Sequence, residues 1–247
     1  IGTVHGIAVS PDGSVYVADT FGDRVRRVDL DGKITTVAGG GTTGVGNIGA
    51  GADALTVNVD NPTDVALGED GSLYIAAPLL NRVLRVRDGV LTVFAGSGGN
   101  VYNGEGNLAT ATSLSNPDAV VVASDGSVYL SDIQQRRVRR VGLDGRVYTV
   151  AGTGILGTDI NIAARQAKVT AQDLAIGPDG LLYIATVEHV LRIDRDGILR
   201  RVAGNPSGTG GDGDPAVDAN FSFIQGITVA PNNVIFIADG SGHRVRM

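Results

Sequence analysis

The sequence predicts an all-β protein assembled from copies of one small antiparallel sheet. In the stretch 6–39, four short apolar runs rich in β-branched residues are separated by turn signals such as Pro-Asp-Gly and Asp-Gly, which is typical of a four-stranded meander. The same pattern returns along the whole chain. Aromatic residues make up only 4% and Trp is absent, so the core must consist of Val, Ile, Leu and Ala, which suits sheet-on-sheet packing.

The first unit sets the pattern for the others. Its apolar runs cover residues 7–9, 15–18, 25–28 and 34–37, and its clearest turns cover 11–13 and 31–32. A single sheet of this size with two apolar faces is not stable alone, because both faces need a partner. The sequence therefore requires further copies of the unit to pack against.

Those copies are present. Complete units occupy 64–96, 119–152 and 173–204, and a fifth unit, 226–247, stops at its third strand. The repeat is also visible as a series of equivalent first-turn positions spaced by 58, 55, 54 and 53 residues: Gly13, Gly71, Gly126, Gly180 and Asn233. We therefore expect one domain over residues 1–247 with units at 6–39, 64–96, 119–152, 173–204 and 226–247.

The linkers between units are repeats as well. The segments 49–62, 104–117, 159–171 and 211–224 share an alanine and, five residues later, an apolar residue. The alanines are Ala54, Ala109, Ala164 and Ala216, and the apolar residues are Val59, Leu114, Val169 and Phe221. This pattern predicts a packed turn, helical in one interpretation. Linkers of about twenty residues suit a return from the outer strand of one sheet to the inner strand of the next, which predicts a β-propeller.

The units resemble a known repeat family. The segment GIAVSPDGSVYVADTFGDRVRRV at 6–28 is similar to NHL repeats, and GDGDPAVDANF at 211–221 resembles the linker of the extended bacterial NHL subtype. The resemblance implies a β-propeller with about five blades; a six-bladed ring with a missing segment is the alternative. It does not choose a function, since NHL propellers include protein-binding, RNA-binding, sensor and lyase members.

Composition narrows the function classes. The net charge of −6, with both signs interspersed, argues against a nucleic-acid partner, which normally meets a basic face. No cysteine is present, which excludes disulfides, thiolate catalysis and Cys-ligated metals. No apolar run of 18 residues is present, so we expect no membrane insertion. The start at Ile1 without Met suggests a part of a longer protein, and the resemblance favours an extracellular or periplasmic bacterial location.

The residues that begin the innermost strands form the first candidate site. In a propeller these positions lie at the mouth of the central channel. All five are polar here, and each precedes an apolar run: His5, Thr63, Asp118, Gln172 and Gln225. They would suit a small polar ligand, a cation or bound water. The alternative is that polar residues stand there only because a channel mouth is wet.

Metal-assisted chemistry is a second hypothesis. Related propeller lyases that cleave peptidyl-hydroxyglycine carry zinc-binding histidines at these positions, but only His5 matches. With Asp118 it supplies two of the three protein ligands that catalytic zinc requires. Streptogramin-type lyases use a His and a Glu with a divalent ion, which draws attention to Glu188, His189 and His243. Adjacent loop residues often point apart, so a surface role is favoured for these.

The acidic linker 211–218 offers a calcium hypothesis. Asp212, Asp214 and Asp218 lie close in sequence, and carboxylate oxygens are calcium ligands. The segment lacks the length and terminal Glu of an EF-hand loop, and GEG at 104–106 takes the aligned position. The interpretation that we favour is a repeated turn in which the carboxylates accept backbone N–H bonds. We assign no catalytic residue, no metal and no cofactor, with calcium and zinc kept as alternatives.

The recurrent arginines of the third strand favour a structural role. They stand at Arg24, Arg82, Arg137 and Arg244, and again at Arg26, Arg85, Arg139 and Arg192. Such regularity suggests that their stems pack between sheets and that they pair with Asp19, Asp132 and Asp239. A phosphate site would instead be concentrated on one side.

The sequence as a whole favours a non-catalytic binding or scaffolding module. Its partner would be a protein, peptide or glycan, bound through the face that carries the linkers and the channel mouth. A metal-assisted lyase or hydrolase at the mouth is the alternative, and an engineered or excised repeat fragment without a selected ligand is another. We expect a monomer, or a dimer through the incomplete fifth blade.

Overall fold

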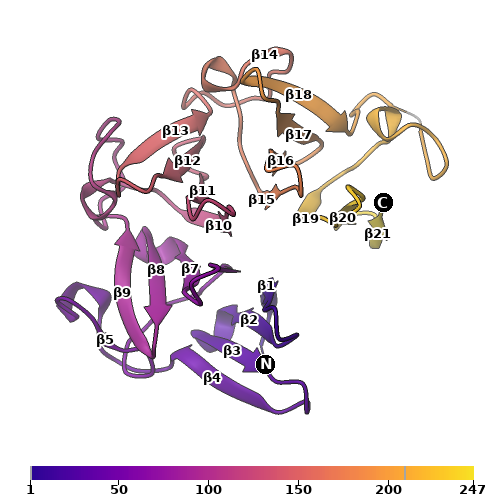
Figure 1. Cartoon of the computed structure of the whole chain (residues 1–247). Coiled ribbons are helices and arrows are strands. Elements are labelled where there is room, and N and C mark those ends of the chain that lie inside the picture. Colours follow the sequence, from indigo (N-terminus) through magenta and orange to yellow (C-terminus); the bar gives the residue numbers. More distant parts are fainter. Residues whose placement is uncertain (1, 209) are drawn as a thin grey trace. The chain divides into compact units, whose positions relative to one another are not determined.

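The computed structural model describes residues 2–208 and 210–247, and its regular structure is five antiparallel sheets with short 3-10 turns (Figure 1). The prediction of an all-β fold made of repeated antiparallel sheets is confirmed. Ile1, which opens the expected domain, lies outside the described residues, as does Thr209. No helix in the described part of the chain is both long and apolar enough to cross a membrane.

The sheets follow the predicted units. The first has the order β1-β2-β3-β4 and consists of β1 (Val4–Val9), β2 (Val15–Asp19), β3 (Arg24–Val28) and β4 (Ile34–Gly39). The second has the order β5-β9-β8-β7-β6 and consists of β5 (Ala52–Asp53), β6 (Asp64–Leu67), β7 (Leu73–Ala77), β8 (Arg82–Arg87) and β9 (Val90–Ala95). The third has the order β10-β11-β12-β13 and consists of β10 (Pro117–Val122), β11 (Val128–Asp132), β12 (Arg137–Val141) and β13 (Val147–Ala151).

The last two sheets complete the series. The fourth has the order β14-β18-β17-β16-β15 and consists of β14 (Ile162–Ala163), β15 (Asp173–Ile176), β16 (Leu182–Ala185), β17 (Val190–Ile193) and β18 (Ile198–Ala203). The fifth has three strands, β19 (Ile224–Val229), β20 (Ile235–Asp239) and β21 (Arg244–Arg246). Two sheets therefore contain a fifth strand, β5 or β14, which the sequence did not predict, because two-residue linker strands carry no periodic signal.

The chain forms two compact units. Unit 1 contains residues up to Val128 together with 141–148, and unit 2 contains 129–140 and 149–247, so the third sheet contributes residues to both. The expectation of a single domain stays a prediction.

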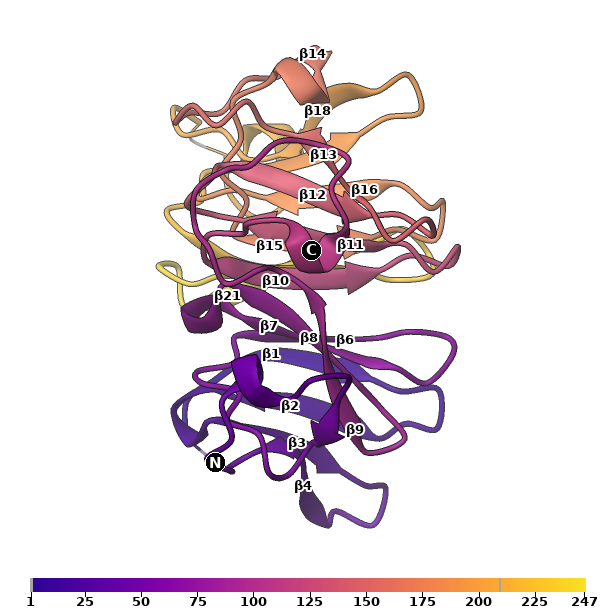
Figure 2. The ribbon, with the colours of Figure 1, turned by 90° about the vertical axis from the view of Figure 1, so that its left-hand side faces the viewer.

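In unit 1 the first two sheets pack face to face (Figure 2). The face of the first sheet carries small and branched residues, among them Ala18 and Val25, which pair across β2 and β3. They contact the bulkier Val65, Ile75 and Leu84 of the second sheet. In unit 2, Tyr183, Ala185 and Val190 of the fourth sheet contact the fifth sheet through Ile224, Ile227 and Ile237. Small residues opposite large ones let the two layers interdigitate.

The linkers are fastened by one repeated hydrogen bond. The glycine that follows or ends each fourth strand donates its N–H to the carbonyl of the linker alanine: Gly39 to Ala54 at 2.9 Å, Gly96 to Ala109 at 2.9 Å, Gly152 to Ala164 at 3.1 Å, and Gly204 to Ala216 at 3.0 Å. All four glycines have positive φ, between 85° and 98°, which explains the residue type. The predicted apolar partners Val59, Leu114, Val169 and Phe221 are at most 3% exposed.

The linker turns are 3-10 rather than α-helical. They cover η4 (Ala109–Ala111), η5 (Ala164–Gln166) and η6 (Ala216–Asp218), and the first linker has η2 (Val45–Asn47) instead. Two further turns, η1 (Thr20–Gly22) and η3 (Pro78–Leu80), connect the second and third strands of the first two sheets. These connections determine which side chains stand at the ends of the sheets.

Candidate functional site

Three of the predicted channel-mouth residues lie in unit 1 at the starts of inner strands. His5 is in β1, Asp118 is in β10, and Thr63 directly precedes β6. The Thr63 N–H donates to the carbonyl of Ala76 at 3.1 Å, and its hydroxyl donates to the backbone carbonyl of Asp118 at 2.8 Å. Thr63 thus ties the start of β6 to the start of β10.

Asp118 is the electrostatic centre of this group. Its side chain is half-buried, and burial raises the pKa of its carboxyl above the ordinary value. The Thr63 hydroxyl and the charge of His5 act in the opposite direction and are smaller. His5, Thr63 and Asp118 are therefore near enough to influence one another, and they offer one carboxylate, one imidazole and one hydroxyl.

The two glutamines belong to unit 2. Gln172 precedes β15, is half-buried and donates its N–H to the carbonyl of Ala185 at 2.8 Å. Gln225 is exposed in β19, and its side chain lies against Gly240, where an added Cβ would meet the Gln225 carboxamide carbon at 2.6 Å. Both residues stand at inner-strand starts, as predicted. Their role as ligand-binding residues stays a prediction.

Two large apolar side chains stand at the same end of the first two sheets as His5 and Thr63. Phe21 in η1 is 73% exposed and Leu79 in η3 is 62% exposed. They occupy equivalent positions in the turn that follows the second strand. The sequence analysis missed them because it searched for polar and titratable residues. The available signal was a bulky apolar residue at the same position of the turn in two successive repeats.

Hydrogen bonds between the first sheet and the next linker fix this end of unit 1. The Thr20 hydroxyl donates to the carbonyl of Pro62 at 2.8 Å. Asp23, at φ 51°, accepts the N–H of Asn61 through Oδ1 at 2.9 Å. In the same way Asn81 Oδ1 accepts the N–H of Asn116 at 3.0 Å. Phe21 and Leu79 therefore project from short, well-anchored turns.

Unit 2 has a less exposed apolar pair at the corresponding end of its sheets, with only Val187 in a turn between second and third strands. Val187, between β16 and β17, is 40% exposed, and Phe223, directly before β19, is 36% exposed. The backbone joins them, because the Ile224 N–H donates to the carbonyl of Val187 at 2.9 Å and the Gly240 N–H donates to that of Phe223 at 2.8 Å.

Glu188 and His189 lie in a tight turn between β16 and β17. The Thr186 N–H donates to the carbonyl of His189 at 2.8 Å, and the His189 N–H donates to Thr186 Oγ1 at 3.1 Å. Burial lowers the pKa of His189, the nearby Arg201 lowers it further, and Glu188 raises it. His243 precedes β21 at φ 51°. These contacts order the turn.

Two of the three carboxylates of the acidic linker, those of Asp212 and Asp214, have protein partners. Asp212 Oδ1 accepts from Arg246 Nε at 2.9 Å, and Asp214 Oδ2 accepts the N–H of Gly211 at 2.9 Å. Asp218 ends η6 and is exposed. No group of three or more His, Cys, Asp or Glu that could hold a metal ion occurs among residues 2–208 and 210–247.

The recurrent arginines make the structural contacts that their spacing indicated. Arg26 Nε lies 3.0 Å from Asp19 Oδ2, Arg139 Nη1 lies 4.0 Å from Asp132 Oδ2, and Arg244 Nε lies 3.4 Å from Asp239 Oδ2. Among the arginines that begin the third strands, Arg82 donates to the carbonyl of Ser97 at 3.1 Å and Arg137 donates to the carbonyl of Thr153 at 3.0 Å. These bonds hold the segment after the fourth strand.

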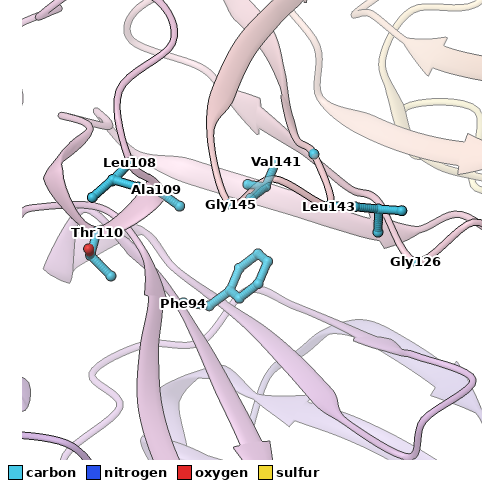
Figure 3. Close-up of a pocket in the computed structure, with 9 residues that line it drawn as sticks. Phe94, Leu108, Ala109, Thr110, Gly126, Val141, Leu143 and Gly145 are labelled. Atoms are coloured by element: carbon cyan, nitrogen blue, oxygen red, sulfur yellow. The ribbon is translucent and has the colours of Figure 1, made fainter.

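Unit 1 has an open groove of about 330 Å³ at the opposite end of the third sheet from Asp118 (Figure 3). Phe94 points into it, and Leu108 and Leu143 border it at 54% and 76% exposure. All of its lining residues are uncharged. The groove therefore offers apolar contact area and no titratable group.

Curated proteins of low sequence identity match most of the chain. No family model matches the chain. Teneurin-m of Drosophila melanogaster is 26% identical over 97% of this chain and 9% of its own length. NHL repeat-containing protein 2 of Gallus gallus is 26% identical over 98% of this chain and 38% of its own length. The chain thus spans well under half of the length of these two curated relatives.

Solved structures agree on the fold. A nidogen in complex with laminin aligns with TM-score 0.67 and 16% identity over 99% of this chain and 74% of that one. Virginiamycin B lyase from Staphylococcus aureus aligns with TM-score 0.61 and 16% identity over 98% and 65%. A gluconolactonase-like protein aligns with TM-score 0.62 and 17% identity over 97% and 72%. At such identities the likeness shows the fold alone.

Proposed function

We propose that this chain, which has teneurins and NHL repeat-containing protein 2 among its homologues and the repeated antiparallel sheets of an NHL-type propeller, is a non-catalytic module that binds a protein partner. The proposed contact surface comprises Phe21 and Leu79, with His5, Thr63 and Asp118 beside them. All five lie in unit 1 at the end of the sheets where the inner strands begin.

The exposure of Phe21 and Leu79 is the observation that carries this proposal. Aromatic and large aliphatic side chains that stand out from an anchored turn, next to polar groups, are typical anchors of protein–protein interfaces. The half-buried Asp118 adds a carboxylate for a donor of the partner. The complex of nidogen with laminin supports the proposal at the level of the fold, because that propeller was solved with a protein partner.

Metal-assisted lysis is the competing function, since virginiamycin B lyase and a gluconolactonase-like protein share the fold. A catalytic zinc site needs three protein ligands. His5 and Asp118 provide two donors of the right type, and Thr63 provides a hydroxyl. A binding surface makes use of all the side chains at this end of unit 1, whereas the lyase hypothesis leaves Phe21 and Leu79 without a role. We therefore favour binding.

The test uses the whole chain and a displayed library of random linear peptides. Peptides selected on the chain are titrated by calorimetry against Phe21→Ser and Leu79→Ser. Each substitution is expected to weaken binding at least about tenfold, the size typical of an interface anchor. Leu30→Ser is the matched control, because Leu30 is 77% exposed at the opposite end of the first sheet.

Two results would contradict the proposal. One is equal weakening by Leu30→Ser, which would show that the peptides only recognise exposed apolar residues. The other is unchanged affinity in both turn variants, with binding lost instead when Phe94 in the groove is replaced. Stoichiometric zinc bound by the wild-type chain and lost in His5→Ala would favour the lyase hypothesis.

A further inference from the structure

The two units contain the same sheet-to-sheet interface. Each sheet has a leading face, defined in the first sheet by Ile7 with its strand partner Val17, and a trailing face, defined there by Ala18 with its partner Val25. In unit 1 the trailing face of the first sheet packs on the leading face of the second. In unit 2 the trailing face of the fourth sheet packs on the leading face of the fifth.

The leading face of the first sheet is open. Ile7 is 60% exposed, whereas its repeat equivalents Val65 and Ile227 are 3% and 8% exposed. Ile34 is 43% exposed, and its equivalent Leu91, which belongs to the core that the first two sheets and the first linker form, is fully buried. The residues are of the same type at each position, so the difference comes from the neighbour and not from the sheet.

The trailing face of the fifth sheet is open in the complementary way. Val245 is 71% exposed, whereas its equivalents Val25 and Val190 are fully buried. Phe236 is 38% exposed, whereas Tyr183 at the same position of the fourth sheet is 4% exposed. Every copy of the chain therefore presents one leading and one trailing face of the kind that its own sheets bury against each other.

We propose that copies of this chain associate head to tail, the leading face of the first sheet in one copy packing on the trailing face of the fifth sheet in another. The partner is identified by complementarity: the small and aromatic residues of a trailing face fit the branched residues of a leading face in both units. Arg26, on the leading face, is paired with Asp19 at 3.0 Å, so this guanidinium does not bring an uncompensated charge into the contact. A head-to-tail contact between unlike surfaces allows dimers and longer assemblies.

The first experiment is the molar mass of the whole chain by light scattering over a hundredfold range of concentration. A mass that rises from 25.2 kDa toward at least twice that value is expected. A mass that stays at 25.2 kDa at all concentrations would overturn the proposal. A chain that stays monomeric and loses unfolding free energy on Ile7→Asp would also overturn the proposal. That result would show that both faces are covered within one chain.

The second experiment tests the head-to-tail geometry. Ile7→Asp and Val245→Asp each place a charge on one face, so each variant alone is expected to be monomeric. Mixed in equal amounts they should form a heterodimer and nothing larger, because one intact face of each kind remains. Leu30→Asp adds the same charge in a turn outside both faces and should associate as the wild type does.

Failure of the mixture to associate would overturn the head-to-tail arrangement. Association of either single variant with itself, at the wild-type affinity, would do the same. Circular dichroism of each variant confirms folding, which is expected because Ile7 and Val245 are already exposed. The peptide titrations of Phe21 and Leu79 use residues outside both faces, so either proposal can fail without the other.

Discussion

The first and second sheets carry the same apolar pattern, and their leading faces differ in what covers them. Val65 of the second sheet is 3% exposed beneath the first sheet, whereas Ile7, at the same repeat position, is 60% exposed. The repeat gives every sheet two apolar faces, and the neighbour decides whether a face becomes core. The same substitution should therefore have different consequences at equivalent positions.

The largest difference is expected at a pair of equivalent glycines. A Cβ on Gly6 would come within 2.6 Å of the Asp64 Cα and 2.8 Å of the Thr63 carbonyl oxygen, whereas the nearest atom to a Cβ on Gly226 is 3.5 Å away. Since backbone cannot move aside cheaply, Gly6→Ala should cost about 3 kcal/mol or more of unfolding free energy. Gly226→Ala should change it by less than about 1 kcal/mol.

Urea denaturation of the two alanine variants measures this difference. Equal costs would mean that the first sheet is not held against the second as tightly as the structure shows. Both experiments belong at concentrations where the chain is monomeric, so that association does not contribute to the unfolding free energy.

Leu91 and Ile34 form the next pair. Leu91 is fully buried in the core of unit 1, so Leu91→Ala should cost about 3 kcal/mol, the transfer free energy together with the cavity. Ile34 is 43% exposed, so Ile34→Ala should cost about 1 kcal/mol. Thermal unfolding of both variants checks the ratio. A cost at Ile34 as large as at Leu91 would indicate that the leading face of the first sheet is covered in solution.

Two aspartate–arginine pairs of the repeat also differ in how deeply they are buried. Asp132 and Arg139 are both fully buried, whereas Arg26 beside the buried Asp19 is 26% exposed. Removing one partner from a fully buried pair costs more, because a charge is left in a medium of low polarity. Asp132→Asn should cost about 3 kcal/mol and Asp19→Asn about 1 kcal/mol. Chemical denaturation at pH 7 tests the order, which reversed costs would contradict.

The smallest effects are expected in the pH dependence of the unfolding free energy at two aspartates whose pKa values are shifted in opposite directions. Burial raises the pKa of Asp19, but the Gly2 N–H and the Arg26 guanidinium together outweigh it, so the net pKa is lowered. The contribution of the Asp19 carboxylate to the unfolding free energy is present above the pKa of the unfolded chain, about 3.9. This contribution is lost as the pH falls through the pKa of the folded chain. Asp19→Asn should therefore destabilise at pH 7 and have less effect near pH 2.

Asp118 should show the reverse dependence. Burial raises the pKa of Asp118. The contribution of this carboxyl to the unfolding free energy is therefore full below the pKa of the unfolded chain, about 3.9, and is lost as the pH rises through the pKa of the folded chain. Asp118→Asn should gain stability relative to wild type between pH 3 and pH 7. A pH profile of unfolding free energy for both variants separates the two cases, and parallel profiles would show that neither carboxyl is shifted as the structure indicates.

Much of the fold could be predicted from local chemistry. Asp-Gly turns and β-branched runs located the strands, and the linker alanines marked the carbonyls that receive the N–H of Gly39, Gly96, Gly152 and Gly204. The extra strands β5 and β14 could not be predicted, since a two-residue pairing depends only on where the linker passes. Of the candidate site, the positions of His5, Thr63 and Asp118 followed from the repeat, whereas the prominence of Phe21 and Leu79 depends on the conformation of short turns.

By itself the sequence determined the repeated four-run pattern, the two apolar faces of every sheet and the polar residue at the start of each inner strand, because these follow from periodicity and turn chemistry within one unit. The tertiary structure decided which equivalent residues are buried. Ile7 and Val65, or Val245 and Val25, have the same local environment in the sequence, and their exposures differ because burial depends on atoms supplied by another sheet. For the same reason only the folded units show that Asp118 is partly withdrawn from water beside Thr63 and His5.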